Sequence, residues 1–154
     1  MKLHRGWILA VAALTGSSVK AGDFPKTALV SMGYEEAAPA DFAATPGYQK
    51  RLADPSGFLA VSADFNGDGK MDEARLLINR DWDEAFIVVT IMTVDLDTYV
   101  LDKMPLAQAA RVGIRPAQSA PGSQKEAVAG LSIFKLDGTS ERLEYFNGEG
   151  FVTR

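Results

Sequence analysis

The chain has 154 residues and no cysteine, and its 20 acidic residues outnumber its 16 lysines and arginines. This length is typical of a single domain. The acidic balance argues against binding to nucleic acid and to anionic membranes, because both repel negative charge. Without disulfides, the stability of the domain depends on its core, its turns and any bound metal.

The first 21 residues have the features of a signal peptide. Lys2 and Arg5 supply positive charge, and the apolar run at 7–14 is too short to span a bilayer. Small residues at Val19 and Ala21 predict cleavage after Ala21. We therefore expect a mature domain at 22–154, periplasmic or secreted, with no stable membrane insertion after cleavage. The alternative is a membrane anchor that is never cut.

Removal of residues 1–21 changes both the charge and the chemistry. The mature chain has 13 basic against 20 acidic residues, and it has no histidine because His4 is the only one in the sequence. Serine and cysteine catalysis that depends on histidine is thereby excluded, as is a typical zinc site. We predict that the protein is not an enzyme, although catalysis by carboxylates alone stays open.

The first part of the mature chain is predicted to be helical. Residues 28–42 favour helix with breaks at Gly33 and Pro39. Thr45 followed by proline predicts a second helix over 46–53, with Thr45 as its N-cap. The composition then changes, and two strands are predicted at 58–63 and 74–79.

The middle of the chain alternates strands with short connections. The segment 85–94 is dense in β-branched residues and continuously apolar, which predicts a central strand covered on both faces. A further strand is predicted at 98–102 and a short helix at 105–111. Residues 115–125 have the composition of a loop.

Two hairpins are predicted at the end of the chain. Residues 131–136 pair with 141–146, and a four-residue loop would place Phe134 opposite Leu143, so that apolar groups share a face. A two-residue loop, which would set Phe134 against Glu141, is disfavoured for that reason. A last strand is expected at 151–153. The predicted fold class is α+β, mainly antiparallel sheet with a few short helices and a calcium-binding loop between two strands.

The acidic segment between the strands predicted at 58–63 and 74–79 has the spacing of a calcium loop. Oxygen-bearing side chains alternate with other residues, and Ca²⁺ takes about six to eight oxygen ligands in flexible geometry. Glycines let the chain turn tightly. The predicted ligands within 64–72 are the side chains of Asp64, Asn66, Asp68 and Asp72 and the backbone carbonyl of Lys70.

This loop differs from an EF-hand, because its twelfth position is Arg75 where an EF-hand has glutamate, and because its flanks are strands. Its three carboxylates would repel one another without an ion, so we expect an empty loop to be mobile. The alternative interpretation is an acidic hairpin loop that binds no metal.

Residues 63–78, Ala-Asp-Phe-Asn-Gly-Asp-Gly-Lys-Met-Asp-Glu-Ala-Arg-Leu-Leu-Ile, resemble the calcium loops of the FG-GAP and VCBS repeat families. They are also similar to the loop of small exported bacterial proteins that carry one such motif. The resemblance implies calcium bound by the five residues just named. The repeat families build propellers from several copies, whereas the motif occurs once here, so a propeller and its adhesion roles are not implied.

Other features have both a functional and a structural interpretation. Trp82 in a polar turn is either a binding anchor or, as we favour, packed over the sheet edge. Asp95 and Asp97 suggest a second cation site or a turn, and a turn is favoured. Four aromatic residues are expected to pack on the sheet rather than form a sugar-binding platform: Tyr99, Tyr145, Phe146 and Phe151.

Three functions follow from these features. The favoured one is a non-catalytic exported domain, stabilised by Ca²⁺, that binds another envelope or secreted protein; an inhibitor or immunity protein against a toxin is one form of it. The second is a carboxylate-dependent hydrolase of an envelope polymer, which needs two acids about 5–10 Å apart across a cleft. The third is a calcium-dependent carbohydrate-binding module with an aromatic platform beside the loop.

Overall fold

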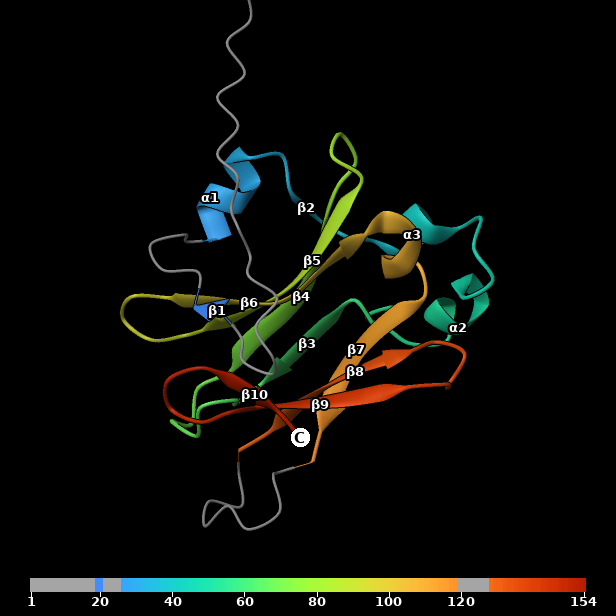
Figure 1. Ribbon diagram of the computed structural model, residues 1–154. Coiled ribbons are helices and arrows are strands. Elements are labelled where there is room, and N and C mark those ends of the chain that lie inside the picture. The colour runs from blue at the N-terminus through green and yellow to red at the C-terminus, as the bar shows by residue number, and fades with distance from the viewer. Residues whose placement is uncertain (1–18, 21–25, 119–127) are drawn as a thin grey trace, which may run out of the picture.

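The computed structural model describes residues 19–20, 26–118 and 128–154 (Figure 1). Strands account for 44% and helices for 14% of the structure, which confirms an α+β fold made mainly of antiparallel sheet. The expected signal peptide lies almost wholly outside the described residues. In the described part of the chain, no helix is long and apolar enough to cross a membrane.

Two antiparallel sheets are formed by the described residues. The larger has six strands in the order β1-β6-β5-β4-β2, with β3 also paired to β4; the smaller has four in the order β10-β9-β8-β7. The larger sheet consists of β1 (Val19–Lys20), β2 (Glu35–Glu36), β3 (Ala60–Ala63), β4 (Asp72–Asn79), β5 (Glu84–Ile91) and β6 (Asp97–Pro105). The smaller consists of β7 (Val112–Ala117), β8 (Gly130–Lys135), β9 (Glu141–Phe146) and β10 (Phe151–Thr153).

The helices are short and lie outside the sheets: α1 (Lys26–Ser31), the 3₁₀ helix η1 (Pro39–Phe42), α2 (Tyr48–Leu52) and α3 (Leu106–Ala109). The helices predicted at 46–53 and 105–111 are confirmed as α2 and α3, but both are shorter. Gly47 rather than Thr45 caps α2, because the Thr45 hydroxyl donates to the carbonyl of Phe42.

The segment 28–42 is only partly helical. It breaks at Gly33, where φ is +88°, and again before η1, as the sequence predicts. Between the breaks, Glu35 and Glu36 form β2 and pair with β4, opposite Ile78 and Leu77. The prediction of helix at these two positions is therefore wrong.

The central strands β4 and β5 send side chains to two separate apolar clusters. One face packs between the two sheets and includes Leu76, Ile78, Ile87 and Val89. The opposite face lies under α1, where Leu77, Phe86 and Val88 contact Leu29 and Tyr34. The prediction of a central strand covered on both faces is confirmed. The strand, β5, ends at Ile91 rather than at residue 94, and Met92 and Val94 beyond it are exposed.

Two predictions in the last third of the chain are wrong. Residues 115–117, predicted to be loop, belong to β7, which pairs with β8. In the next hairpin Phe134 lies opposite Glu141, not Leu143. The core lies on the face of Leu131 and Ile133, so Phe134 points the other way and packs under the guanidinium of Arg115.

Candidate metal centre

The predicted calcium loop closes the hairpin between β3 and β4. Ala63 and Asp72 are the last paired residues of the two strands, so the loop starts and ends at one point of the sheet. Gly67 and Gly69 have φ values of +74° and +85°, the left-handed conformation that glycine adopts without a steric cost. In Figure 1 the loop is the green segment between β3 and β4, on the opposite side of the molecule from α2.

Asp64 organises the first half of the loop. Its Oδ1 accepts hydrogen bonds from the backbone N–H groups of Gly67 at 2.6 Å and Asp68 at 3.2 Å, and its Oδ2 accepts one from Gly69 at 2.8 Å. The backbone thus wraps around this carboxylate. The carbonyl of Asp64 also accepts the N–H of Ala129, which ties the loop to the segment before β8.

Asn66 and Asp68 continue the same pattern towards solvent. Asn66 Oδ1 accepts the N–H of Asp68 at 3.0 Å, and Asp68 Oδ1 accepts the N–H of Lys70 at 2.8 Å. The bond from the Lys70 backbone holds the pKa of Asp68 below its usual value, and the Lys70 charge adds to this effect. Asp68 is therefore ionised, as a carboxylate must be to bind a metal, and it is exposed to solvent.

Asp72, in contrast, is fully buried. Its Oδ2 accepts the N–H of Phe65 and its Oδ1 the N–H of Met92, both at 2.8 Å, so it links the loop to the turn after β5. Burial raises the pKa of Asp72, and the charge of Asp68 raises it further in spite of the bonds from the amides. The carboxylate thus occupies a site where its negative charge is unfavourable.

These residues fit Ca²⁺ in donor type and in charge. All five predicted donors are oxygens, and the repulsion between Asp68 and Asp72 is one that a cation would relieve. Oδ2 of Asp72 accepts the N–H of Phe65 and Oδ1 that of Met92, and each carboxylate oxygen has two lone pairs. As arranged here, however, no three acidic, histidine or cysteine side chains of the described residues are close enough to hold a metal ion together.

A cluster of aromatic side chains packs against the loop 64–72. Phe65 meets Phe151 edge-on with ring centroids 6.0 Å apart, and Tyr99 lies 5.7 Å from both Phe146 and Phe151. Tyr99 and Phe151 are buried, and Phe146 packs against the same core. The prediction that these aromatics pack on the sheet is confirmed, and the loop is fixed to strands of both sheets.

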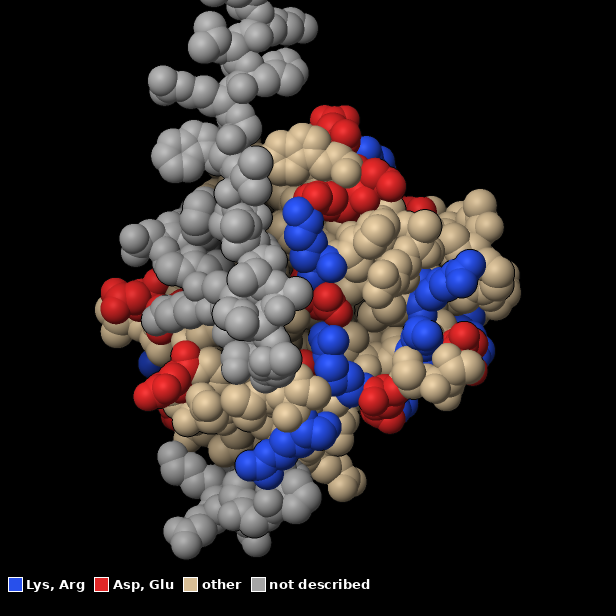
Figure 2. Space-filling model, in the orientation of Figure 1, with Lys and Arg blue, Asp and Glu red and all other residues tan. Residues whose placement is uncertain are grey.

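A second group of charged residues joins the two sheets, and the sequence did not single it out. Arg142 on β9 lies 3.1 Å from Asp102 on β6 and 2.8 Å from Glu144 on its own strand. Burial raises the pKa of Glu144, and Asp102 adds to the rise. Figure 2 shows basic and acidic side chains alternating over the middle of this face. Because Arg142 lies between both acids and pairs with each, its charge offsets part of theirs, and the two carboxylates share one cation.

A β-bulge in β6 turns the side chain of Asp102 towards Arg142. The register between β5 and β6 shifts after Val88, which pairs with Val100, so that Ile87 pairs with Asp102. Bulges of this kind change the direction of side chains, and the alternation of apolar residues in a sequence does not reveal them. A search for buried acids could have found this group only after the register of both sheets was known.

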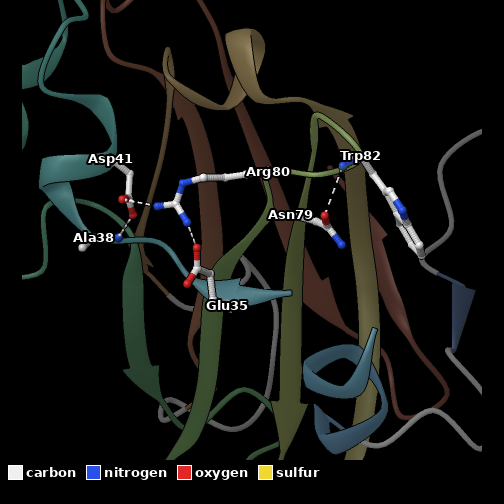
Figure 3. A network of polar contacts seen from close by, with 6 residues as sticks. All are labelled: Glu35, Ala38, Asp41, Asn79, Arg80 and Trp82. Carbon is white, nitrogen blue, oxygen red and sulfur yellow. Dashed lines mark hydrogen bonds and ion pairs between the residues drawn. The ribbon is translucent and has the colours of Figure 1, made fainter. Parts of the chain in front are cut away.

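Trp82 lies in the turn between β4 and β5 (Figure 3). Its backbone N–H donates to Asn79 Oδ1 at 3.2 Å. The neighbouring Arg80 pairs with Glu35 and with Asp41. The indole is 52% exposed and meets Tyr34 edge-on at 81°. These two rings are perpendicular, so they do not form a flat platform for a sugar.

Comparisons with known proteins found no matching family model, no similar curated protein and no similar solved structure. The resemblance of residues 63–78 to the FG-GAP and VCBS loops therefore stays a prediction that rests on the loop itself.

Proposed function

We propose that the protein is a non-catalytic exported domain that binds Ca²⁺ in the loop 64–72 and binds another protein of the envelope or the exterior. Asp64, Asn66, Asp68, the Lys70 carbonyl and Asp72 would hold the ion. The observation that carries the proposal is that one hairpin loop between β3 and β4 gathers three carboxylates, of which Asp72 is fully buried; burial raises its pKa, and the charge of Asp68 adds a smaller rise. Bound calcium would supply the positive charge that both carboxylates need.

The proposed role of the ion is to brace the fold. The loop joins β3 to β4, Asp72 bonds the turn after β5, and Asp64 bonds the segment before β8. A cation held by these two acids would therefore stabilise contacts between four segments of a chain that has no disulfide. Export is supported by the charged and apolar N-terminal sequence and by the small residues at Val19 and Ala21.

Thermal unfolding with and without calcium tests the metal site. At about 100 times the Kd, calcium should stabilise the fold by about 2.7 kcal/mol and raise the Tm by about 5–10 °C. Asp68→Ala should remove this rise. Asp137→Ala is the matched control, since Asp137 is another exposed turn aspartate that accepts a bond from a backbone N–H two residues on, that of Thr139.

The control should respond to calcium as the unmodified protein does. A Tm that does not change when chelator is replaced by calcium, or a rise that survives in Asp68→Ala, would refute the metal site.

A further inference from the structure

Strand β6 has different neighbours on its two sides. On one side it pairs with β5 along its length. On the other side it pairs with β1 alone among the described strands, through Val19 opposite Val100 and Lys20 opposite Tyr99. Figure 1 shows β1 as a short blue segment against the outer side of β6. The outer edge of β6 thus accepts an extended chain in antiparallel orientation.

Processing would remove this neighbour. Both residues of β1 precede the cleavage site expected after Ala21, so they leave with the signal peptide. In the processed chain β6 becomes the outermost strand of the larger sheet. The backbone groups of an edge strand are a template for pairing with another strand, and natural proteins cover or block such edges.

Exposed apolar residues lie next to this edge. The turn from β5 into β6 contains Val94, which is 96% exposed, and Leu96, which is 48% exposed. The same turn contains Asp95 and has no lysine or arginine. Leu96 has a φ of +52°, a left-handed conformation that is uncommon for a residue with a side chain. An apolar side chain is therefore displayed at the start of the strand at a cost in backbone strain.

We propose that the edge of β6 at Tyr99 and Val100, once residues 1–21 have been removed, accepts an extended segment of another protein by strand addition. The segment pairs antiparallel, as β1 does, and it carries apolar residues alternating with lysine or arginine. Apolar residues fit Val94 and Leu96, and basic residues complement the acidic turn. The sequence of β1 itself, Val-Lys, has this alternation. The inference rests on the proposed export and identifies the surface for the proposed protein binding.

The bulge in β6 limits the length of the docking edge. Leu101 is the extra residue of the register shift, between Val100 and Asp102. A bulge increases the local twist and interrupts regular pairing. The incoming strand therefore pairs with the first part of β6, beside the apolar turn, where main-chain bonds supply affinity and alternate side chains supply specificity.

Hydrogen–deuterium exchange tests this directly. The processed chain is purified from the envelope fraction, its N-terminus is verified by mass spectrometry, and exchange is measured with and without a short synthetic peptide of alternating valine and lysine. Successive N–H groups of a strand point to opposite sides, so one of the two amides of Tyr99 and Val100 faces the outer edge, and the peptide should slow exchange at that amide by about tenfold or more. A peptide of alternating valine and glutamate should leave the exchange unchanged.

An uncleaved variant separates the edge from the rest of the surface. Ala21→Tyr places a large residue where signal peptidase requires a small one, so β1 is retained. Its β6 amides should be protected without peptide, and it should bind the valine–lysine peptide about tenfold more weakly than the processed chain. Val94→Ser should weaken binding to the processed chain about threefold, while Val30→Ser, an equally apolar exposed site on α1, should not.

The outcomes distinguish this inference from the proposed function. Equal protection of β6 in the processed and uncleaved chains, or no effect of the peptide, overturns the docking edge even where calcium raises the Tm. A processed chain that dimerises through β6 and excludes the peptide also overturns it, because the occupant is then a second copy. A purified chain that retains residues 1–21 overturns this inference, because β1 then still covers the edge, whereas the response of the Tm to calcium tests the proposed function separately.

Discussion

Two buried charged side chains lie on opposite sides of this molecule. One donates to backbone carbonyls, and the other accepts backbone N–H groups. Arg51 on α2 is fully buried and donates to the carbonyls of Gly57, Ala109 and Val112 at 2.8–2.9 Å. Asp72 is equally buried at the loop 64–72 and accepts backbone N–H groups. Both use main-chain dipoles in place of an opposite charge.

The difference lies in what surrounds each charge. Burial lowers the pKa of Arg51 to about 10, so the guanidinium stays charged at neutral pH, and the Phe42 ring lies 4.5 Å from it. Burial raises the pKa of Asp72, and the nearby carboxylate of Asp68 adds a smaller rise. On the α2 side three backbone carbonyls face the guanidinium, although its Nε has no hydrogen-bond partner in the described part of the chain, whereas the loop side has an excess of negative charge. This contrast is the physical argument for a cation at the loop alone.

The largest expected effect is the loss of Arg51. In Arg51→Met three buried carbonyls lose their donor, and each unsatisfied group costs about 1–3 kcal/mol, so we expect a loss of about 3 kcal/mol or more in the free energy of unfolding. Urea denaturation measures it. Arg111→Met, at an exposed position, should change stability by less than about 0.5 kcal/mol. Equal losses in both variants would contradict the role given to Arg51.

A smaller effect is expected for Asp72→Asn. The amide keeps one acceptor oxygen for two backbone donors, so stability in chelator should fall by about 1–3 kcal/mol. The variant should also lose the response to calcium. Asp95→Asn, in the exposed turn after β5, serves as the control and should keep it. If Asp72→Asn is instead more stable than the unmodified protein in chelator, burial of the negative charge outweighs its hydrogen bonds.

The smallest effect concerns the charged group between the two sheets. Because burial raises the pKa of Glu144 above its ordinary 4.5, the folded chain binds a proton at a higher pH than the unfolded chain does. Between these two pKa values the folded state holds more protons, so this group makes the free energy of unfolding rise as the pH falls. In Glu144→Gln this contribution should be absent.

Denaturation curves at several pH values between 7 and about 4.5 measure the contribution of Glu144. At pH 7 we expect the substitution to change stability by about 1 kcal/mol or less, since the pair with Arg142 is partly solvated. Superimposable pH profiles of the variant and the unmodified protein would show that the Glu144 pKa is not raised.

The sequence was informative where one residue pattern dominates. The continuous apolar run at 85–94 predicted a strand with two covered faces, because only a central position buries both sets of side chains. The acidic loop was also placed correctly between two strands, since glycines and aspartates cannot continue either one. In both cases the local preference and the tertiary contacts agree.

The features that the sequence did not predict depend on contacts between residues far apart in the chain. Phe134 and Glu141 lie opposite each other, and both contact Arg115 on β7. The sequence analysis assigned the second half of β7 to a loop because it contains Arg115 and Pro116. Arg51 gave no signal at all, because its partners are backbone carbonyls and not acidic side chains that could be matched in the sequence. Asp72 was predicted to be a ligand, but the sequence did not reveal that the carboxylate is buried and accepts the N–H of Met92 in the turn after β5.

The backbone conformation of Leu96 lowers the stability of the turn between β5 and β6. Its left-handed backbone costs about 1–2 kcal/mol for a residue with a side chain, and glycine would remove that cost. The chain instead keeps a leucine there and leaves nearly half of it in water. Stability alone would favour glycine, so under the proposed docking at β6 folding and binding compete at Leu96, and the more stable Leu96→Gly variant should bind the valine–lysine peptide more weakly.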